Sequence, residues 1–437
     1  MSENNFDLVV IGGGPAGYVG AIRAAQLGQK VAVIEKRKEL GGTCLNVGCI
    51  PSKALLDSTE RYHSAKEEFS EHGIDFKSLN FDLKKMMERK RGVVNKLTSG
   101  IDFLFKKNKI ERFLGVGKFV SASDEQVQIE VDLGNEKKAL SGKKVLLATG
   151  SVPVELPILP FDEKKILSST GALSLDEVPE HLVVVGGGYI GLEMGSVWAR
   201  LGAKVTVVEF LDELLPMCDR GLAKRLQKEL EKTGLEILSG TKCLGAQEKG
   251  EGLEVELEKL KDQSKSVISC SHILVSAGRR PYTEGLHLDT VGIKKNKAGQ
   301  IEVNDHFQTA HSNIYAVGDL IDGPMLAHKA EEEAIAAVEL MNGQVGHVNY
   351  ATIPSVIYTS PELASVGFTE AELKEAGVDY KSGSSLFGAN GRAVAMNEEH
   401  GQVKVLSEKS TDRILGVHIL GPRAVSYTHL TLPTIGC

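Results

Sequence analysis

Short apolar runs that end in glycine or in an acidic residue recur along this chain of 437 residues. The first run, residues 6–11, is continuous enough to form a buried parallel strand, and it leads into the glycine turn G-G-G-P-A-G. A stretch with a helical pattern follows as far as Leu27, and Gly28 suits the position just after a helix. The next apolar run, residues 30–34, ends at Glu35. The pattern therefore predicts a strand, a glycine turn, a helix, a second strand and an acid.

The same order of elements returns further along the chain. Residues 181–185 lead into G-G-G-Y-I-G, and a strand ends at Glu209, so that each landmark is displaced by 174 residues. One such turn is a weak signal, whereas two copies with an identical spacing to the acid predict two dinucleotide sites, each in a doubly wound domain. The glycines that let the backbone approach a pyrophosphate are Gly12, Gly14 and Gly17 in the first copy and Gly186, Gly188 and Gly191 in the second.

The two acids indicate how each nucleotide is held. Glu35 and Glu209 are expected to accept hydrogen bonds from an adenosine ribose. A carboxylate that faces the 2′-hydroxyl repels a 2′-phosphate, and the run after the second strand, E-F-L-D-E, contains no arginine. The second site is therefore expected to prefer NAD over NADP.

Three more apolar runs end in small residues, glycine or aspartate. They read V-L-L-A-T-G-S at 145–151, I-L-V-S-A-G-R-R-P at 273–281 and N-I-Y-A-V-G-D at 313–319. Each alone is an ordinary turn after a strand. Together, and in this order, they indicate a chain that leaves and re-enters nucleotide-binding domains of α/β class.

Composition narrows the functional classes. The chain is 42% hydrophobic and 25% charged, which is typical of a globular protein with several domains. A net charge of −7 disfavours nucleic-acid binding. The N-terminus does not resemble a signal peptide, and no apolar run reaches the roughly 18 residues that a membrane span needs. These features predict a cytoplasmic enzyme that binds neither nucleic acid nor membrane.

Two cysteines follow the first glycine fingerprint closely. Cys44 and Cys49 lie in G-G-T-C-L-N-V-G-C-I-P-S-K, whereas the other four cysteines are isolated in the sequence. A zinc site would need a second pair of Cys or His ligands downstream, so no metal is predicted and a redox pair is favoured. Pro51 suits the first turn of a helix over residues 52–56, which would place Cys49 near the positive end of that helix, where a thiolate is favoured.

These motifs, in this order, resemble the pyridine nucleotide-disulfide oxidoreductases, and within that family the lipoamide branch. The resemblance covers about residues 4–424 and includes A-T-G-S, S-A-G-R-R-P, A-V-G-D and M-L-A-H-K-A. It implies two doubly wound, Rossmann-like dinucleotide-binding domains and a C-terminal α+β dimerisation domain that is incomplete here. The implied boundaries are 1–152 for the FAD-binding domain, 153–280 for the NAD-binding domain, 281–350 for a segment completing the FAD side, 351–424 for the dimerisation domain and 425–437 for an aberrant tail.

The resemblance also implies roles for single residues. Cys44 would be the thiol that meets the substrate, Cys49 the thiol against the flavin, and Lys53 would lie beside the flavin and pair with Glu193. The first fingerprint, with Glu35, would hold FAD, and the second fingerprint, with Glu193 and Glu209, would hold NAD. Further FAD contacts would come from Gly117, Thr149, Gly150, Ser151, Asp319, Met325, Leu326, Ala327 and His328, and a further NAD contact from Gly278.

The implied reaction is the oxidation of a protein-bound dihydrolipoyl group. Electrons would pass from the substrate to the Cys44–Cys49 disulfide, and then through FAD to NAD⁺. The implied partners are the lipoyl domains of 2-oxoacid dehydrogenase or glycine cleavage complexes and a second copy of the chain. Three alternatives stay open at this point, namely a mercuric or glutathione type of reductase, a non-catalytic flavoprotein subunit, and a nucleotide-binding redox sensor.

The sequence departs from the family near its C-terminus. The family carries a histidine backed by a glutamate in an H-P-T-x-S-E segment, which acts as the base for the substrate thiol. Here the sequence after G-V-H-I-L-G-P-R-A reads V-S-Y-T-H-L-T-L-P-T-I-G-C, and His429 has no glutamate after it. We therefore expect a chain that binds FAD and NAD but turns over dihydrolipoamide poorly and dimerises weakly.

Overall fold

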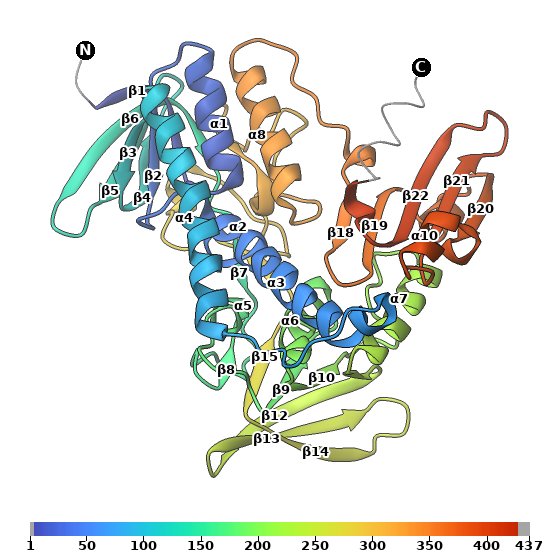
Figure 1. The fold of residues 1–437 in the computed structure, drawn as a ribbon. Helices are drawn as coiled ribbons and strands as arrows, with labels where there is room; N and C mark the ends of the chain where they lie inside the picture. The colour runs from blue at the N-terminus through green and yellow to red at the C-terminus, as the bar shows by residue number, and fades with distance from the viewer. Residues whose placement is uncertain (1–3, 427–437) are drawn as a thin grey trace. The chain divides into compact units, whose positions relative to one another are not determined.

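The computed structural model describes residues 4–426, which form two compact units (Figure 1). Each unit is assembled from three separate segments of the chain. The described part of the first unit comprises residues 4–51, 90–153 and 279–348. That of the second unit comprises residues 52–89, 154–278 and 349–426.

The first unit is built on a seven-stranded sheet whose central strands are parallel. The strand order is β3-β2-β1-β6-β5-β4, and β17 pairs with β6. The apolar runs noted in the sequence are its central strands, and Leu8, Val9 and Val10 are fully buried because both faces of the sheet are covered. The strands are β1 (Asn5–Ile11), β2 (Val31–Glu35), β3 (Glu111–Leu114), β4 (Val116–Ala122), β5 (Val127–Asp132), β6 (Lys137–Leu147) and β17 (Ile314–Ala316).

Two helices pack side by side in this unit, α1 (Pro15–Gln26) and α8 (Ala327–Met341) (Figure 1). Gly20 permits their close approach, because a Cβ placed on it would lie 3.3 Å from Ala334 Cβ. The remaining elements of the unit are short: α2 (Gly42–Val47), β7 (Ser151–Pro153), which pairs with β16 (Arg279–Pro281), η2 (Leu288–Val291) and η3 (Gly318–Leu320).

Two long helices begin in one unit and end in the other, α3 (Cys49–Glu67) and α4 (Leu83–Lys107). Helix α3 begins three residues before the predicted start at residue 52, so Cys49 is its first residue. Pro51 is compatible with this start, because the first turn of a helix tolerates a missing N–H. Helix α3 is followed by the short η1 (Phe69–His72), after which Gly73 adopts a φ of 72°.

The second unit contains a five-stranded parallel sheet in the order β11-β10-β9-β15-β8. Its core includes the fully buried Trp198. The strands are β8 (Ile166–Leu167), β9 (His181–Val185), β10 (Lys204–Val208), β11 (Leu235–Leu238) and β15 (His272–Val275), and the helices are α5 (Ser169–Ala172), α6 (Tyr189–Arg200) and α7 (Arg220–Lys232). A three-stranded antiparallel sheet is formed by β12 (Thr241–Lys249), β13 (Gly252–Lys259) and β14 (Lys265–Cys270).

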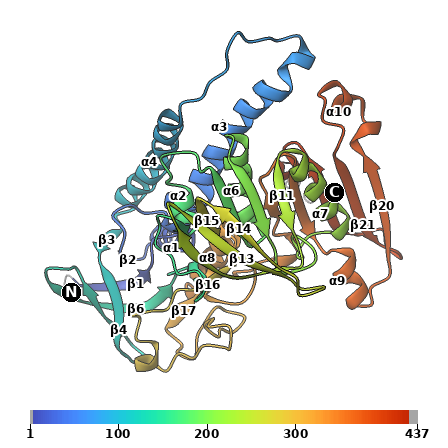
Figure 2. The same cartoon turned by 90° about the horizontal axis from the view of Figure 1, so that it is seen from below.

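The second unit also contains an antiparallel sheet from the C-terminal part of the chain, in the order β18-β19-β22-β21-β20. Helix α7 lies between β11 and this sheet, whose edge strand is β20 (Figure 2). The elements are η4 (Tyr350–Thr352), β18 (Ser355–Ile357), β19 (Glu362–Gly367), α9 (Glu370–Glu375), β20 (Tyr380–Leu386), η5 (Phe387–Ala389), α10 (Gly391–Ala395), β21 (Gln402–Glu408) and β22 (Ile414–Gly421). No helix in residues 4–426 is both long and apolar enough to cross a membrane.

Candidate active site

The first glycine fingerprint forms a turn into which only glycine fits. Gly12 has a φ of 108°, and a Cβ on it would lie 2.3 Å from Ala148 O. A Cβ on Gly17 would lie 1.8 Å from Gly12 O. Gly14 is the N-cap of α1 and offers no side-chain cap, so the first N–H groups of the helix are left for a ligand.

The second fingerprint repeats this geometry. Gly186 has a φ of 110°, and a Cβ on it would lie 2.6 Å from Ser276 O. A Cβ on Gly191 would lie 2.2 Å from Gly186 O. Gly188 is the N-cap of α6, and a Cβ on it would meet no atom within 4 Å, so open space lies in front of this helix.

The two acids are held in the same way. Glu35 Oε2 accepts the Gly13 N–H at 2.7 Å, and its Oε1 accepts the Arg37 N–H at 2.8 Å. Glu209 accepts the N–H groups of the residues at the equivalent positions, at 2.6 and 2.8 Å. Each carboxylate is thereby fixed at the end of a strand, beside its glycine turn. The open helix N-terminus and the fixed carboxylate together fit a dinucleotide at each site.

The two cysteines predicted to form the redox pair lie on two successive helices of the chain. Cys44 is in α2 and half-buried, and Cys49 is exposed at the first position of α3. Gly48 separates the two helices, and a Cβ on it would lie 2.9 Å from Thr43 O and 3.4 Å from Cys44 Cα. The absence of a side chain at Gly48 therefore lets the backbone beside Cys49 approach the backbone at Cys44.

The other described cysteines have a different environment. Cys218, Cys243 and Cys270 are buried, and burial raises the pKa of the thiols of Cys218 and Cys270 to about 12. A thiol with such a pKa is not a nucleophile at neutral pH. These three residues are therefore core side chains.

Lys53 and Glu193 meet within the second unit. Lys53 Nζ donates a hydrogen bond of 2.7 Å to Glu193 Oε2, and Glu193 Oε1 accepts the Tyr358 N–H at 3.1 Å. Lys53 Nζ also lies 4.4 Å from the centroid of the Tyr358 ring, within range of a cation–π interaction. Glu193 is buried on α6, so the position of the partly exposed ammonium group is fixed by a rigid carboxylate.

Asp319 and Ser151, both predicted to contact FAD, also meet. The Ser151 hydroxyl donates to Asp319 Oδ2 at 2.5 Å. Arg279 supports this pair, because its Nε donates to Ser151 Oγ at 2.8 Å and its Nη2 to Ser151 O at 2.7 Å. The S-A-G-R-R-P motif is recognisable in the sequence but the role of Arg279 is not, because sequence alone does not show which group an arginine contacts.

The other predicted FAD contacts lie at strand and helix ends of the first unit. Gly117 is in β4, where a Cβ would lie 3.0 Å from Ile34 Cδ1. Thr149 donates to Tyr282 O at 2.5 Å, and Gly150 O accepts the Tyr282 N–H at 2.8 Å. The M-L-A-H segment is half-buried and leads into α8 at Ala327. In the second unit, Gly278 has a φ of 110° and open space where a Cβ would be.

A tyrosine that the sequence did not indicate as part of the site lies in the first unit, on the helix that follows the first glycine fingerprint. Tyr18, on α1, donates a hydrogen bond of 3.0 Å to Glu331 Oε1 on α8. Burial and the charge of Glu331 raise the pKa of Tyr18, with a smaller contribution from Cys44. Burial likewise raises the pKa of Glu331. A tyrosine next to a glycine fingerprint gives no signal of such a contact in the sequence.

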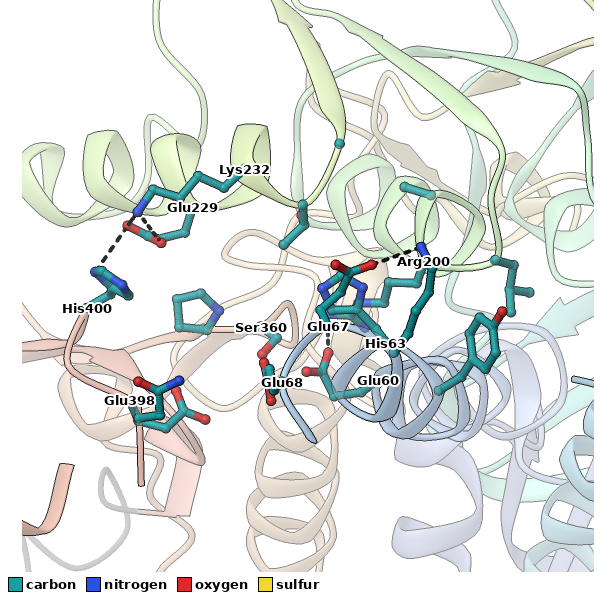
Figure 3. A pocket seen from close by; sticks show the side chains of 18 of the residues that line it. Glu60, His63, Glu67, Glu68, Arg200, Glu229, Lys232, Ser360, Glu398 and His400 are labelled. Carbon is teal, nitrogen blue, oxygen red and sulfur yellow. Dashed lines mark hydrogen bonds and ion pairs between the residues drawn. The ribbon is translucent and has the colours of Figure 1, made fainter. Parts of the chain in front are cut away.

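A cavity of about 670 Å³ in the second unit is lined by charged side chains (Figure 3). Arg200, at the end of α6, lies 2.5 Å from Glu60 Oε2, and Lys232 lies 2.9 Å from Glu229 Oε1. His400 approaches the same Glu229 carboxylate at 3.9 Å. None of the residues predicted to react or to hold a cofactor is among those that line it, so this cavity is not the predicted site.

Comparison with known proteins identifies the family. The model of the pyridine nucleotide-disulphide oxidoreductase family matches residues 6–334, and the model of its dimerisation domain matches residues 353–431. The chain belongs to the pyridine nucleotide-disulphide oxidoreductase family. The match to the dimerisation domain continues beyond residue 424, the predicted end of an incomplete domain. This domain of the family is therefore present in the chain. Residues 427–437, including His429, lie outside the described part of the chain.

Individual members of the family are similar over nearly the whole chain. The mitochondrial dihydrolipoyl dehydrogenase of Pisum sativum is 52% identical over 429 residues, which is 98% of this chain and 85% of the pea protein. A leghemoglobin reductase of Glycine max is 52% identical over 98% of this chain and 81% of its own length. The solved structure of RclA, a HOCl-induced flavoprotein disulfide reductase from Escherichia coli, matches with a TM-score of 0.84 at 27% identity, over 97% of this chain and 92% of RclA.

Proposed function

We propose that this chain catalyses the oxidation of protein-bound dihydrolipoamide to lipoamide, coupled to the reduction of NAD⁺, with FAD as the intermediate electron carrier. The observation that carries the proposal is the arrangement of Cys44 and Cys49 on either side of Gly48, next to the first fingerprint. The identity of 52% to a dihydrolipoyl dehydrogenase over 98% of the chain supports the lipoyl substrate. The same identity favours an enzyme that oxidises dihydrolipoamide over a mercuric or glutathione reductase and over a non-catalytic subunit.

In the proposed redox step, Cys44 and Cys49 are the only protein groups that exchange electrons with the substrate. A substrate thiolate attacks Cys44 Sγ, the Cys44–Cys49 bond breaks, and Cys49 leaves as a thiolate. The second substrate thiol then displaces Cys44, so that the lipoyl ring closes and the protein holds two thiols. The position of Cys49 at the N-terminus of α3, a helix of 19 residues, suits the thiolate formed in the first step.

The cofactors are assigned by the two fingerprints. Gly12, Gly14, Gly17 and Glu35 would bind FAD, which supplies a two-electron acceptor for the thiols and a donor for NAD⁺. The exposure of Cys49 in the protein alone leaves that thiol accessible to a bound flavin. The other predicted FAD ligands are Lys53, Gly117, the segment 149–151, Asp319 and the segment 325–328.

NAD would be bound by the second fingerprint. Its residues would be Gly186, Gly188, Gly191 and Glu209, together with Glu193 and Gly278. The Glu209 carboxylate is held by two backbone N–H groups, so it faces a bound ribose with little freedom to move away. A 2′-phosphate would meet this fixed negative charge, which favours NAD over NADP.

Partners and location follow from the proposed reaction. The substrate would be carried by lipoyl domains of 2-oxoacid dehydrogenase or glycine cleavage complexes, and the match to a dimerisation domain supports a homodimer. The cytoplasm stays the predicted location, although the pea relative is named as mitochondrial. The domain boundaries at residues 152, 280, 350 and 424 likewise stay a proposal.

Steady-state kinetics with dihydrolipoamide and NAD⁺ test the proposal. The purified protein should contain flavin and produce NADH, while Cys44→Ser and Cys49→Ser should each lower kcat by roughly 10³-fold or more and keep the flavin, because each removes one half of the redox pair. Cys270→Ala removes a buried thiol outside the pair and should keep most of the activity. Activity of either Ser variant within tenfold of the wild type would refute the mechanism, and preferential reduction of glutathione disulfide or Hg²⁺ would refute the substrate.

A further inference from the structure

A buried ion pair follows directly, in the chain, after the segment 325–328 that is predicted to contact FAD. Lys329 and Glu333, four residues apart on α8, both have fully buried side chains, and Lys329 Nζ lies 3.1 Å from Glu333 Oε1. Removing two charges from water costs several kcal/mol per ion, and apolar residues of similar size often stabilise a core equally well. The pair therefore needs an explanation beyond packing, and its other contacts supply one.

Both charged groups bind the turn between β17 and α8. Lys329 Nζ donates to Gly318 O at 3.2 Å and to Asp322 O at 3.1 Å. Glu333 Oε2 accepts the Gly318 N–H at 2.7 Å. With Glu333, the three donor positions of the ammonium group thus have three acceptors, which is what burial of a lysine requires.

The hydrogen bonds of Lys329 and Glu333 matter most at Gly318, because its backbone conformation is the least restricted. It has a φ of 72°, and a Cβ on it would lie 3.0 Å from Ala330 Cβ, so glycine is required here. Glycine also populates many other backbone conformations, so an unsupported turn could reorient at this point. Because Glu333 holds its N–H and Lys329 holds its C=O, both peptide planes that flank Gly318 are fixed.

The next residue is Asp319, whose carboxylate accepts a side-chain hydrogen bond on one of its two oxygens. Asp319 Oδ2 accepts the Ser151 hydroxyl at 2.5 Å, and Oδ1 has no hydrogen-bond partner within residues 4–426. The residue is half-buried at the start of a short 3₁₀ helix. The backbone on one side and Ser151 on the other thus leave a single carboxylate oxygen directed by the protein but available to a ligand.

We propose that Lys329 and Glu333 are positioning residues for FAD binding. Through Gly318 the pair sets the direction of the Asp319 carboxylate, and Asp319 in turn binds a hydroxyl group of the cofactor. This inference rests on the proposed function, since it takes FAD as the ligand of the first unit. Neither Lys329 nor Glu333 touches the cofactor in this scheme.

Two double variants test the proposal through the dissociation constant of FAD, measured by flavin fluorescence on the full chain. Lys329→Met/Glu333→Leu removes both charges and the acceptor for the Gly318 N–H, and it should weaken FAD binding at least tenfold. Lys329→Met/Glu333→Gln removes the charges but keeps an acceptor oxygen for that N–H, and it should recover most of the loss. If the variant with Leu at position 333 does not fold, the variant with Gln still tests the proposal, because its affinity for FAD should be about threefold lower than that of the wild type.

The control that separates positioning from stability is a mutant cycle with Asp319→Asn. If the pair acts through Asp319, both double variants should change FAD affinity by less than twofold in the Asp319→Asn background. An undiminished loss in that background would refute the proposal. Glu339→Gln removes another ion pair from the same helix, the one to Arg23, without touching the Gly318 turn, and it should leave FAD affinity within twofold of the wild type.

The outcomes also separate this proposal from the proposed function. A wild-type protein that binds no FAD refutes the function and the positioning role together. The positioning role alone is refuted if the wild-type protein binds FAD and both double variants bind it with the same affinity as the wild type and with an unshifted flavin absorption spectrum.

Discussion

Glu398 is a carboxyl group whose surroundings oppose its ionisation. It is half-buried on the wall of the cavity in Figure 3, where burial and the negative charges of Glu68 and Glu60 raise its pKa from 4.5 to about 7. In the unfolded chain the group ionises near the lower value, so between the two values the folded state binds more protons than the unfolded state. Its contribution to stability is therefore fully present below about pH 4.5 and is lost as the pH rises through about 7.

Replacing Glu398 by glutamine should remove this pH dependence, because the amide keeps the shape of the side chain and does not ionise. We expect a gain in melting temperature of roughly 1–2 °C at pH 8 and a clearly smaller gain at pH 5. Differential scanning calorimetry at both pH values measures the effect. Glu399→Gln, at the exposed neighbouring position, is the matched control, and an equal gain for Glu398→Gln at both pH values would contradict the assigned cause.

The structural role of some residues can be predicted from the sequence, whereas that of others cannot. The fingerprint glycines and the acids at the strand ends are recognisable because a local backbone constraint demands them. Lys329 and Glu333 are not, because a Lys and a Glu four residues apart in A-H-K-A-E-E-E-A are typical of an exposed helix face. Their burial and their hydrogen bonds to the Gly318 turn depend on the tertiary fold.

The duplicated strand–turn–helix–strand element is reproduced even in its minor contacts. A Cβ on Gly13 would lie 2.7 Å from Leu40 Cδ2, and a Cβ on Gly187 would lie 2.4 Å from Leu214 Cδ2, again 174 residues further on. The sequence predicted the element because its order and spacing are local. The start of α3 was predicted three residues late, since Gly48 allows the new helix to begin directly at Cys49.

Matched substitutions in the two copies should affect different cofactors. Glu35→Gln and Glu209→Gln each replace one carboxylate oxygen by an amide NH₂, which cannot accept a hydrogen bond from the backbone or the ribose. We expect about tenfold weaker binding of FAD in the first variant, and of NAD with a reduced preference over NADP in the second. Fluorescence titrations of both cofactors against both proteins measure this. A loss of FAD affinity in Glu209→Gln equal to its loss of NAD affinity would show that the copies are not independent.

At the scale of the whole molecule, the chain divides the two sites between two units that interleave in sequence. The first fingerprint and the predicted redox cysteines belong to the first unit, and the second fingerprint with the Lys53–Glu193 pair belongs to the second. The strand-end motifs at 145–151, 273–281 and 313–319 indicated a chain that leaves and re-enters its nucleotide-binding domains, and the family resemblance implied a split FAD domain. Neither predicted that residues 52–89 belong to the second unit. Strand order within a sheet depends on long-range pairing, such as that of β17 with β6, which no local pattern encodes.

This division predicts that the two half-reactions can be separated by mutation. Cys44→Ser removes the thiol that meets the substrate, so dihydrolipoamide should no longer reduce the flavin, whereas NADH should still reduce it at close to the wild-type rate. Glu209→Gln should do the reverse: reduction by dihydrolipoamide stays within about twofold of the wild type, and reduction by subsaturating NADH slows by about tenfold. Anaerobic stopped-flow absorption of the flavin measures both rates, and each variant is the control for the other. If either substitution slowed both half-reactions equally, the two sites would have to act as one, and the separate roles assigned to the two fingerprints would be wrong.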